Sequence, residues 1–72
     1  MQKWEYLHIA LTFMSERIDI TANGKPVFES VTQKELYTYL NTLGVQGWEM
    51  ISIIGGPRVP PDLYVFKRLL DN

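Results

Sequence analysis

The chain has 72 residues and a net charge of −1, and it contains no cysteine and one histidine, His8. A chain of this length forms one domain, residues 1–72, and buries only about 60% of the surface that its unfolded form exposes. The missing cysteines exclude disulfides, thiolate metal sites and cysteine nucleophiles, and a single histidine excludes a histidine-rich metal site.

Charge and hydropathy exclude further classes of protein. The seven basic residues are scattered apart from the pair Lys67-Arg68, whereas nucleic-acid modules depend on clustered positive charge. No apolar run approaches the roughly 20 residues that span a bilayer, and the N-terminus lacks the pattern of a signal peptide. We expect a cytoplasmic protein without a cofactor and without nucleic-acid or membrane partners. Self-association is then the remaining means of stabilising so small a domain.

Residues 4–13 are rich in aromatic and branched side chains and contain neither Gly nor Pro, which predicts a strand. The alternation of a strand divides its side chains into two sets, one on each face: Trp4, Tyr6, His8, Ala10 and Thr12, against Glu5, Leu7, Ile9, Leu11 and Phe13. Both sets are largely apolar, so we expect this strand to be covered on both faces.

A hairpin follows the first strand. Residues 17–21 alternate between polar and apolar side chains, and Asn23-Gly24 lies where a tight turn needs positive φ at two successive residues. A second arm at 25–29 completes the hairpin. Pro26 cannot donate a ladder hydrogen bond, which places this arm at a sheet edge or at the start of a strand.

The start of a helix is the sharpest local pattern. Thr32 and Glu35 match a capping box, in which each side chain accepts a hydrogen bond from an amide that the helix leaves unpaired. Val31 and Leu36 occupy the two positions of a hydrophobic staple. The pattern predicts a helix over residues 33–43.

The apolar face of this helix is formed by Leu36, Leu40 and Leu43 at helical spacing. Gly44 follows them and is predicted to be the left-handed residue that ends the helix. Val45 would then fold back on Leu40.

Two more strands are predicted after the helix. Residues 48–54 show little polarity on either face, and residues 63–70 follow a loop that contains three prolines. We interpret loop segment 57–61 as a stiff turn in preference to a polyproline ligand. The predicted fold class is α+β: an antiparallel sheet of four to five strands, in the order strand, hairpin, helix, strand, strand, with the helix packed on one face.

Three separated blocks of the sequence resemble a known family. They are Lys-Trp-Glu-Tyr at 3–6, Leu-Asn-Thr-Leu-Gly-Val-Gln-Gly-Trp-Glu-Met at 40–50, and Tyr-Val-Phe-Lys-Arg at 64–68. Together they are similar to the family called domain of unknown function 4177. The resemblance covers nearly the whole chain and implies a compact bacterial or phage-type α+β domain. It carries over no activity, because the family has no established catalytic residues. His8 and the Pro-rich loop depart from the pattern of the family.

The sequence offers little chemistry. His8 with Glu5 or Glu49 is the one acid–base constellation, but Glu5 and His8 have opposite parity and point to opposite faces. Glu49 would reach His8 only in a favourable strand register, so a packed histidine is the favoured interpretation. Residues 44–47 follow a helix instead of opening one, which favours chain reversal over a phosphate loop. We expect no catalytic residue and no metal site, and therefore no enzyme.

Aromatic side chains supply the main candidate surface. A core or interface role is favoured over a stacking platform, because Lys67 and Arg68 point to opposite faces. The candidate surface for a ligand or partner comprises Trp4, Tyr6, His8, Trp48, Tyr64 and Arg68. Two functions follow. The first is a non-enzymatic module that self-associates through its sheet and binds a protein partner. The alternative is a binder of a nucleotide-like small molecule, with an aromatic-lined pocket at a subunit junction.

The sheet itself predicts a homo-oligomer, with a dimer favoured. One helix of about three turns covers one side of a sheet, and the other side would expose an apolar patch that soluble monomers rarely leave bare. A twofold dimer would bury it. We expect the face of Trp4 and Tyr6 to point toward the helix, with an aliphatic interface on the opposite face: Leu7, Ile9, Leu11, Ile51 and Ile53.

Overall fold

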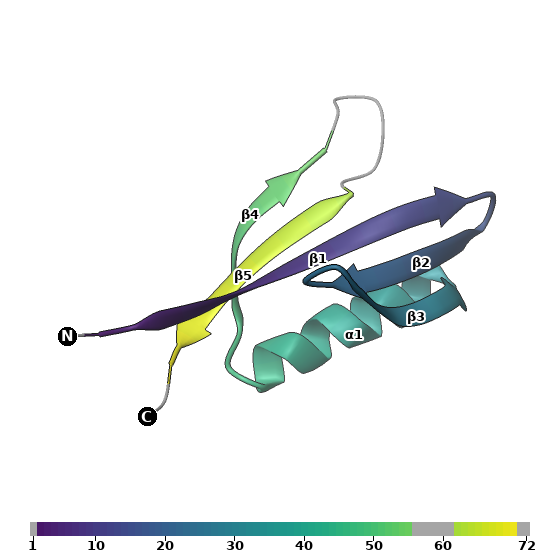
Figure 1. Cartoon of the computed structure of the whole chain (residues 1–72). Coiled ribbons are helices and arrows are strands. Elements are labelled where there is room, and N and C mark those ends of the chain that lie inside the picture. Colours follow the sequence, from purple (N-terminus) through teal and green to yellow (C-terminus); the bar gives the residue numbers. More distant parts are fainter. Residues whose placement is uncertain (1, 56–61, 71–72) are drawn as a thin grey trace.

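The computed structural model describes residues 2–55 and 62–70, and over these ranges it shows five strands and one helix (Figure 1). The bounds are β1 Trp4–Met14, β2 Arg17–Ala22, β3 Lys25–Val31, α1 Gln33–Val45, β4 Glu49–Ile54 and β5 Leu63–Leu69. The predicted order of elements is confirmed. The predicted turn at 57–61 lies outside the described residues.

The five strands form one antiparallel sheet in the order β3-β2-β1-β5-β4, which confirms the predicted α+β class. β1 is the central strand, and its two halves pair with different neighbours, β5 and β2. Residues Trp4–Ala10 pair with β5 and residues Ile9–Met14 pair with β2, so that only Ile9 and Ala10 pair on both sides. The sheet is therefore staggered, and the molecule is elongated, with extents of 45 × 23 × 19 Å (Figure 1).

The hairpin between β2 and β3 has the predicted turn. Asn23 and Gly24 have φ angles of 51° and 83°, and Pro26 lies on β3, an edge strand, as predicted. Asn23 also extends the ladder past the end of β2. Its backbone N–H donates to the His8 carbonyl, and its side-chain Oδ1 accepts from the His8 N–H, both at 2.8 Å. The turn residue thus pairs with β1 where β2 has already ended.

The start of α1 confirms the capping box. The Glu35 N–H donates to Thr32 Oγ1 at 3.2 Å, and the Thr32 N–H donates to Glu35 Oε1 at 3.3 Å. Val31 and Leu36, at the two positions of the predicted staple, are both buried in the core. Local sequence therefore sets the direction in which the helix leaves β3.

The end of α1 differs from the prediction. The helix continues through Gly44 to Val45, and the left-handed residue is Gly47, with φ 95°. The Trp48 N–H donates to the Leu43 carbonyl and the Gly47 N–H donates to the Gly44 carbonyl, both at 3.0 Å, which are the two bonds of a Schellman motif. Val45 does not fold back on the helix and is 89% exposed. Trp48 packs against the core in its place.

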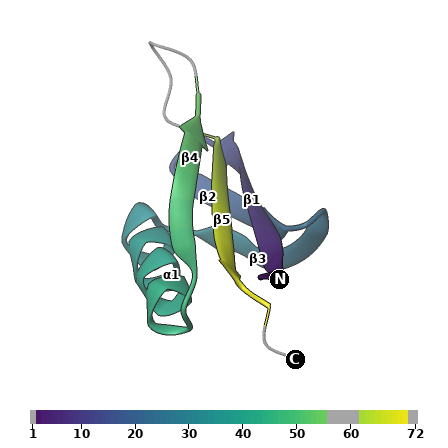
Figure 2. The same ribbon diagram turned by 90° about the vertical axis from the view of Figure 1, so that its left-hand side faces the viewer.

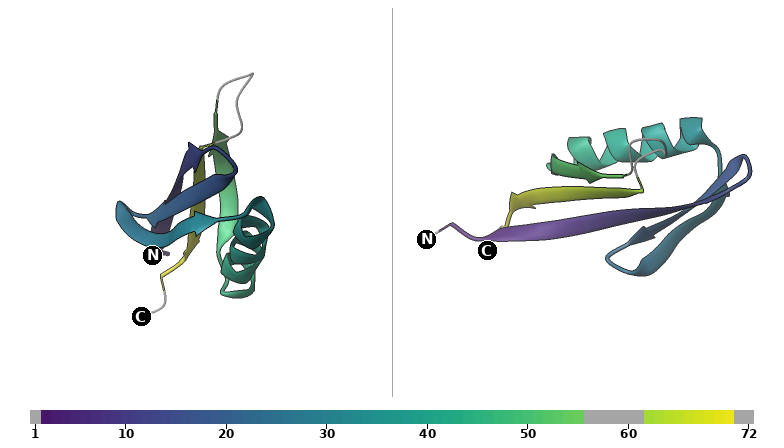
Figure 3. Two further views of the ribbon diagram at one scale, coloured as in Figure 1. Left: turned by 90° about the vertical axis from the view of Figure 1, so that its right-hand side faces the viewer. Right: turned by 90° about the horizontal axis from the view of Figure 1, so that it is seen from above.

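The core is one cluster of buried side chains to which α1 and four of the strands contribute. Its members are Ile9, Leu11, Ile18, Ile20, Val31, Leu36, Leu43, Tyr64 and Phe66. α1 runs along one side of the sheet (Figures 2 and 3), and the strand with which it makes its main contacts is β2. Leu36 and Leu43 are its buried residues, whereas Leu40, at the centre of the predicted stripe, is only partly buried.

The side of β1 that points into the core is the opposite of the one we expected. Ile9 is 0% exposed and Leu11 is buried, whereas Trp4 and Tyr6 on the other face are exposed. Parity separates the two sets of side chains but does not say which set faces inward. Pairing with β2 decides this, because it places Leu11 opposite Ile20 within the buried cluster.

Two residues near the end of α1, the buried Leu43 and the exposed Val45, test this packing. Leu43→Ala should lower the free energy of unfolding by about 2 to 5 kcal/mol, because it removes buried methyl groups and leaves a cavity. Val45→Ala, two residues later, should change it by less than about 0.5 kcal/mol, because Val45 is exposed. Urea melts of both variants measure the difference. Equal effects would show that the buried face of α1 is misassigned.

Candidate functional site

The six side chains of the predicted ligand surface do not lie together. Three of them share one face of β1: Trp4, Tyr6 and His8. The strand register places Glu5 opposite Arg68 and Ile9 opposite Tyr64. Because directly paired residues share a face, Arg68 and Tyr64 lie on the side of the sheet that carries the core. The structure therefore brings together only half of the predicted set.

The other two aromatic residues of that set are less exposed than Trp4 and Tyr6. Tyr64 is buried in the core beside Phe66, in agreement with the core interpretation of these two residues. Trp48 is half-buried, and the Arg68 guanidinium lies 4.2 Å from its ring centroid. Tyr64 and Trp48 are therefore less accessible to a ligand than Trp4 and Tyr6.

The predicted interface set is also divided. Ile9 and Leu11 are buried inside the chain, and the half-buried Leu7 packs against the same cluster. These three residues are not available to a second copy, and this part of the prediction is wrong, because leucines of α1 belong to the cluster that buries them. Ile51 and Ile53 are exposed, on β4 at the border of the sheet.

The face opposite the core is called the open face below. Its apolar members include Trp4, Tyr6, Ala10, Ile54, Leu63, Val65 and Leu69, and the register places polar residues among them at His8, Glu49, Ser52 and Lys67. None of the described elements forms a layer over this face (Figure 3). Toward β2 the face becomes polar, with Thr12 paired to Asp19. The open face is thus an apolar patch with a polar border.

An aromatic and charged group marks one end of the open face. Lys67 Nζ lies 4.3 Å from the ring centroid of Trp4, close enough for a cation–π interaction. Lys67 is also paired across the strands with Tyr6 on one side and Glu49 on the other. Tyr6 is 52% exposed, so it remains accessible beside this group.

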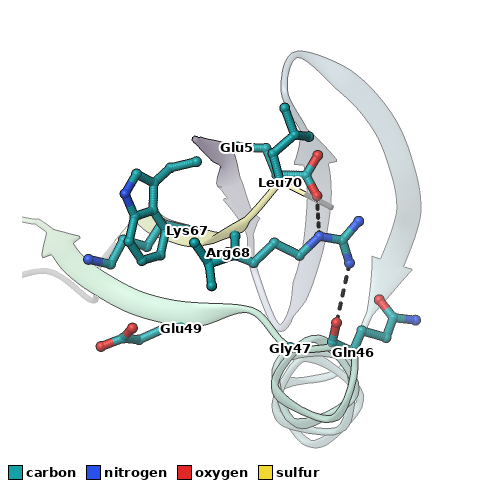
Figure 4. Close-up of a pocket in the computed structure, with 9 residues that line it drawn as sticks. Glu5, Gln46, Gly47, Glu49, Lys67, Arg68 and Leu70 are labelled. Carbon is teal, nitrogen blue, oxygen red and sulfur yellow. Dashed lines mark hydrogen bonds and ion pairs between the residues drawn. The ribbon is translucent and has the colours of Figure 1, made fainter. Parts of the chain in front are cut away.

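A cleft of about 840 Å³ lies at the same end of the sheet and reaches the turn after α1 (Figure 4). Arg68 lies at its centre. The Arg68 Nε forms an ion pair with the Glu5 carboxylate, and Nη1 donates to the backbone carbonyl of Gln46 at 3.2 Å. Together with its contact to Trp48, Arg68 ties the C-terminal turn of α1 to β1 and β5.

The charges that line the cleft balance one another. Glu5 and Glu49 are matched by Lys67 and Arg68, and both basic side chains already have partners in this structure. A phosphate group would have to compete with those partners. The cleft therefore suits a neutral or zwitterionic ligand. From the sequence alone, Glu5 and Glu49 are candidates only as partners of a histidine, because no local pattern indicates that Glu5 contacts Arg68, 63 residues away.

The structure brings neither carboxylate to His8. Glu5 points from the opposite face of β1, as its parity predicts, and Glu49 lies on β4, which β5 separates from β1. His8 is exposed on the open face and is not packed in the core. Among residues 2–55 and 62–70, no three His, Asp or Glu side chains are grouped closely enough to hold a metal ion.

Comparisons with known proteins add no assignment. No family model, curated protein or solved structure matches the chain. The resemblance to the domain of unknown function 4177 family therefore stays a prediction. In the part of the chain that the structure describes, α1 is too short and too polar to cross a membrane.

Burial raises the pKa of two tyrosines above the ordinary value of 10.0. The cause at Tyr39 is desolvation, and its ring also makes an edge contact with Phe28 at 5.0 Å between centroids. At Tyr64 desolvation is the larger cause, and the charge of Tyr37 adds to it. Both tyrosines hold their protons more tightly in the folded chain than in the unfolded chain.

This difference predicts a loss of stability in alkali. Below pH 10.0 both states keep the phenolic proton and these groups contribute nothing; as pH rises through the unfolded pKa, the unfolded chain releases the proton first and gains stability. Tyr64→Phe should therefore reduce the alkaline fall in unfolding free energy measured by urea melts. If Tyr64→Phe and Tyr39→Phe both lose stability in alkali as steeply as the parent protein does, the raised pKa values of these tyrosines are not the cause.

Proposed function

We propose that this chain is a non-enzymatic interaction module that self-associates as a dimer through its open face and binds a protein partner. The observation that supports this most directly is that Trp4, Tyr6 and their apolar neighbours on β5 lie on a face that no described element covers. Contiguous apolar patches on small soluble proteins mark interaction sites.

The composition of the open face favours a protein over other partners. Protein interfaces combine an apolar centre, enriched in Tyr and Trp, with a polar border. The open face has this arrangement, with Val65 and Leu63 near its centre and Thr12 and Asp19 toward β2. Stacking the open faces of two copies about a twofold axis would bury the patch with one self-complementary surface.

The cellular location and the family resemblance are part of the same proposal. We infer a cytoplasmic location, in keeping with the absence of cysteine from the sequence. The resemblance to the domain of unknown function 4177 family is in keeping with a small α+β binding domain and adds no catalytic role.

Two tyrosines of equal exposure provide the test. Tyr6 and Tyr37 are each 52% exposed, but Tyr6 lies on the open face and Tyr37 lies on α1. Tyr6→Glu should raise the dissociation constant of the dimer by about tenfold or more, because it places a charge in an apolar interface, while Tyr37→Glu should leave it unchanged. Sedimentation equilibrium gives both values, and circular dichroism checks that the variants fold. A monomeric parent protein, or equal effects of the two changes, would contradict the proposal.

The cleft around Arg68 favours a second candidate, a binder of a small planar molecule. Its volume of about 840 Å³ lies within the range of ligand sites, about 300 to 1,000 Å³. Trp4 supplies an aromatic surface and Arg68 a fixed cation. Of the residues predicted for a nucleotide-like pocket, these two line the cleft and His8 does not.

A thermal-shift screen of nucleosides, nucleotides and zwitterionic metabolites tests this candidate. A ligand that binds only the folded chain must raise its melting temperature, by an amount that grows with the logarithm of ligand concentration over the dissociation constant. The shift should disappear in Trp4→Leu and persist in Tyr37→Leu, which alters an exposed aromatic residue that does not line the cleft. No shift with any compound, or one that survives Trp4→Leu, would contradict a ligand role for the cleft.

A further inference from the structure

The two edges of the sheet are built differently. β3, at one edge, carries several of the features that keep an edge strand from pairing with another chain. Lys25 and Pro26 lie at its start, and its register with β2 shifts twice. Near its end Ser30 has a positive φ, and its N–H donates to the Asp19 carboxylate at 2.8 Å instead of to a ladder carbonyl.

β4, at the other edge, has few such features. It contains no lysine and no proline, and its one charged residue, Glu49, is its first. Met50–Ile54 is uncharged, with all four apolar side chains between 39% and 53% exposed. One bulge at Ile51 is its only irregularity. β4 is hydrogen-bonded to β5 on one side, and no described residue pairs with its other side (Figure 2).

We propose that the free edge of β4 pairs with β4 of a second copy of this chain, antiparallel about a twofold axis. The distribution of charge selects this occupant. A strand that lies beside Met50–Ile54 without burying an unpaired charge must itself be uncharged over about five residues and carry apolar side chains on both faces. Met50–Ile54 meets that requirement, with Met50 and Ile53 on one face and Ile54 on the other beside the neutral Ser52.

Charge also selects the direction of pairing. In an antiparallel pair centred on the strand, the two Glu49 carboxylates lie at opposite ends, five residues or about 17 Å apart along the strand. This separation exceeds the Debye length of about 8 Å at physiological ionic strength, so their repulsion is screened. Parallel pairing would set the two carboxylates side by side, where like charges destabilise a sheet.

Such a dimer continues the sheet from one copy into the next. The two open faces then lie side by side as one larger apolar surface, available to a partner or to a second pair. The edge contact does not depend on stacking of the open faces, and it goes beyond the function proposed above.

Amide hydrogen exchange on the full chain tests the edge directly. The outward-facing N–H groups of β4 should gain protection as the protein concentration rises from micromolar to millimolar, because they acquire carbonyl acceptors. The corresponding groups of β3 should not. Stacking of the open faces leaves β4 without new backbone acceptors, so the measurement separates the two contacts.

A pair of matched variants completes the test. Ile53→Lys places a charge on the free edge at an exposed position and should raise the dissociation constant of the edge-paired dimer by about tenfold or more. Val27→Lys makes a similar change on the edge that is already protected and should have no effect. Ile51→Lys serves in the same way if Ile53→Lys does not fold.

Three results would overturn the proposal. The first is β4 protection that is independent of concentration, and the second is a dimer that survives both lysine variants on β4. The third is a protein that stays monomeric with unprotected β4 amides at millimolar concentration, which would leave the strand of a different protein as the occupant. A dimer that is lost in Tyr6→Glu but shows no β4 protection would overturn the edge contact alone and leave the proposed function standing.

Discussion

The divided pairing of β1 is the constraint on which the rest of this structure depends. One strand of 11 residues serves two neighbours, and only Ile9 and Ala10 have partners on both sides. The two halves of the sheet are therefore joined over a short overlap, and Ile9, at 0% exposure, lies in it. A short overlap provides few ladder hydrogen bonds, so side-chain packing around Ile9 must hold the halves together. The stagger also leaves the first residues of β1 without β2 beside them, which is where Asn23 supplies its extra hydrogen bonds.

The chain reversal after α1 depends on two interactions of different strength. The Schellman motif satisfies the carbonyls of Leu43 and Gly44 and turns Trp48 toward the core. Arg68 then joins this turn to Glu5. Both members of that ion pair are more than a third exposed, and such pairs contribute at most about 1 kcal/mol. Arg68 therefore positions the end of the helix more than it stabilises the fold, and this position shapes the cleft.

A domain with one helix has more apolar surface than it can bury. The side chains of α1 reach the core side of β1, β2 and β5, while the open face and the free edge of β4 remain without a cover among the described residues. These two surfaces differ in kind. The open face offers side chains alone, and the β4 edge also offers unpaired backbone groups, which select a strand as partner. The edge on β3, by contrast, carries charge, proline and an irregular register, features that disfavour pairing with another chain.

The sequence by itself determined the elements, because each depends on interactions within a few residues. The capping box of Thr32 and Glu35 and the Asn23-Gly24 turn place their own hydrogen bonds and backbone angles locally, and alternation along β1 separates its two faces. The tertiary structure alone decided which face became the core, since the alternating pattern is symmetric until β2 and β5 pair with it. It also decided which glycine ends α1. Gly44 and Gly47 are equally able to adopt a positive φ, and with Gly47 as the left-handed residue Trp48 packs against the core. The contact of Arg68 with Glu5 could not be predicted from the sequence either. The two residues are 63 positions apart, and a local pattern cannot indicate a contact that forms only when folding brings the two ends of the chain together.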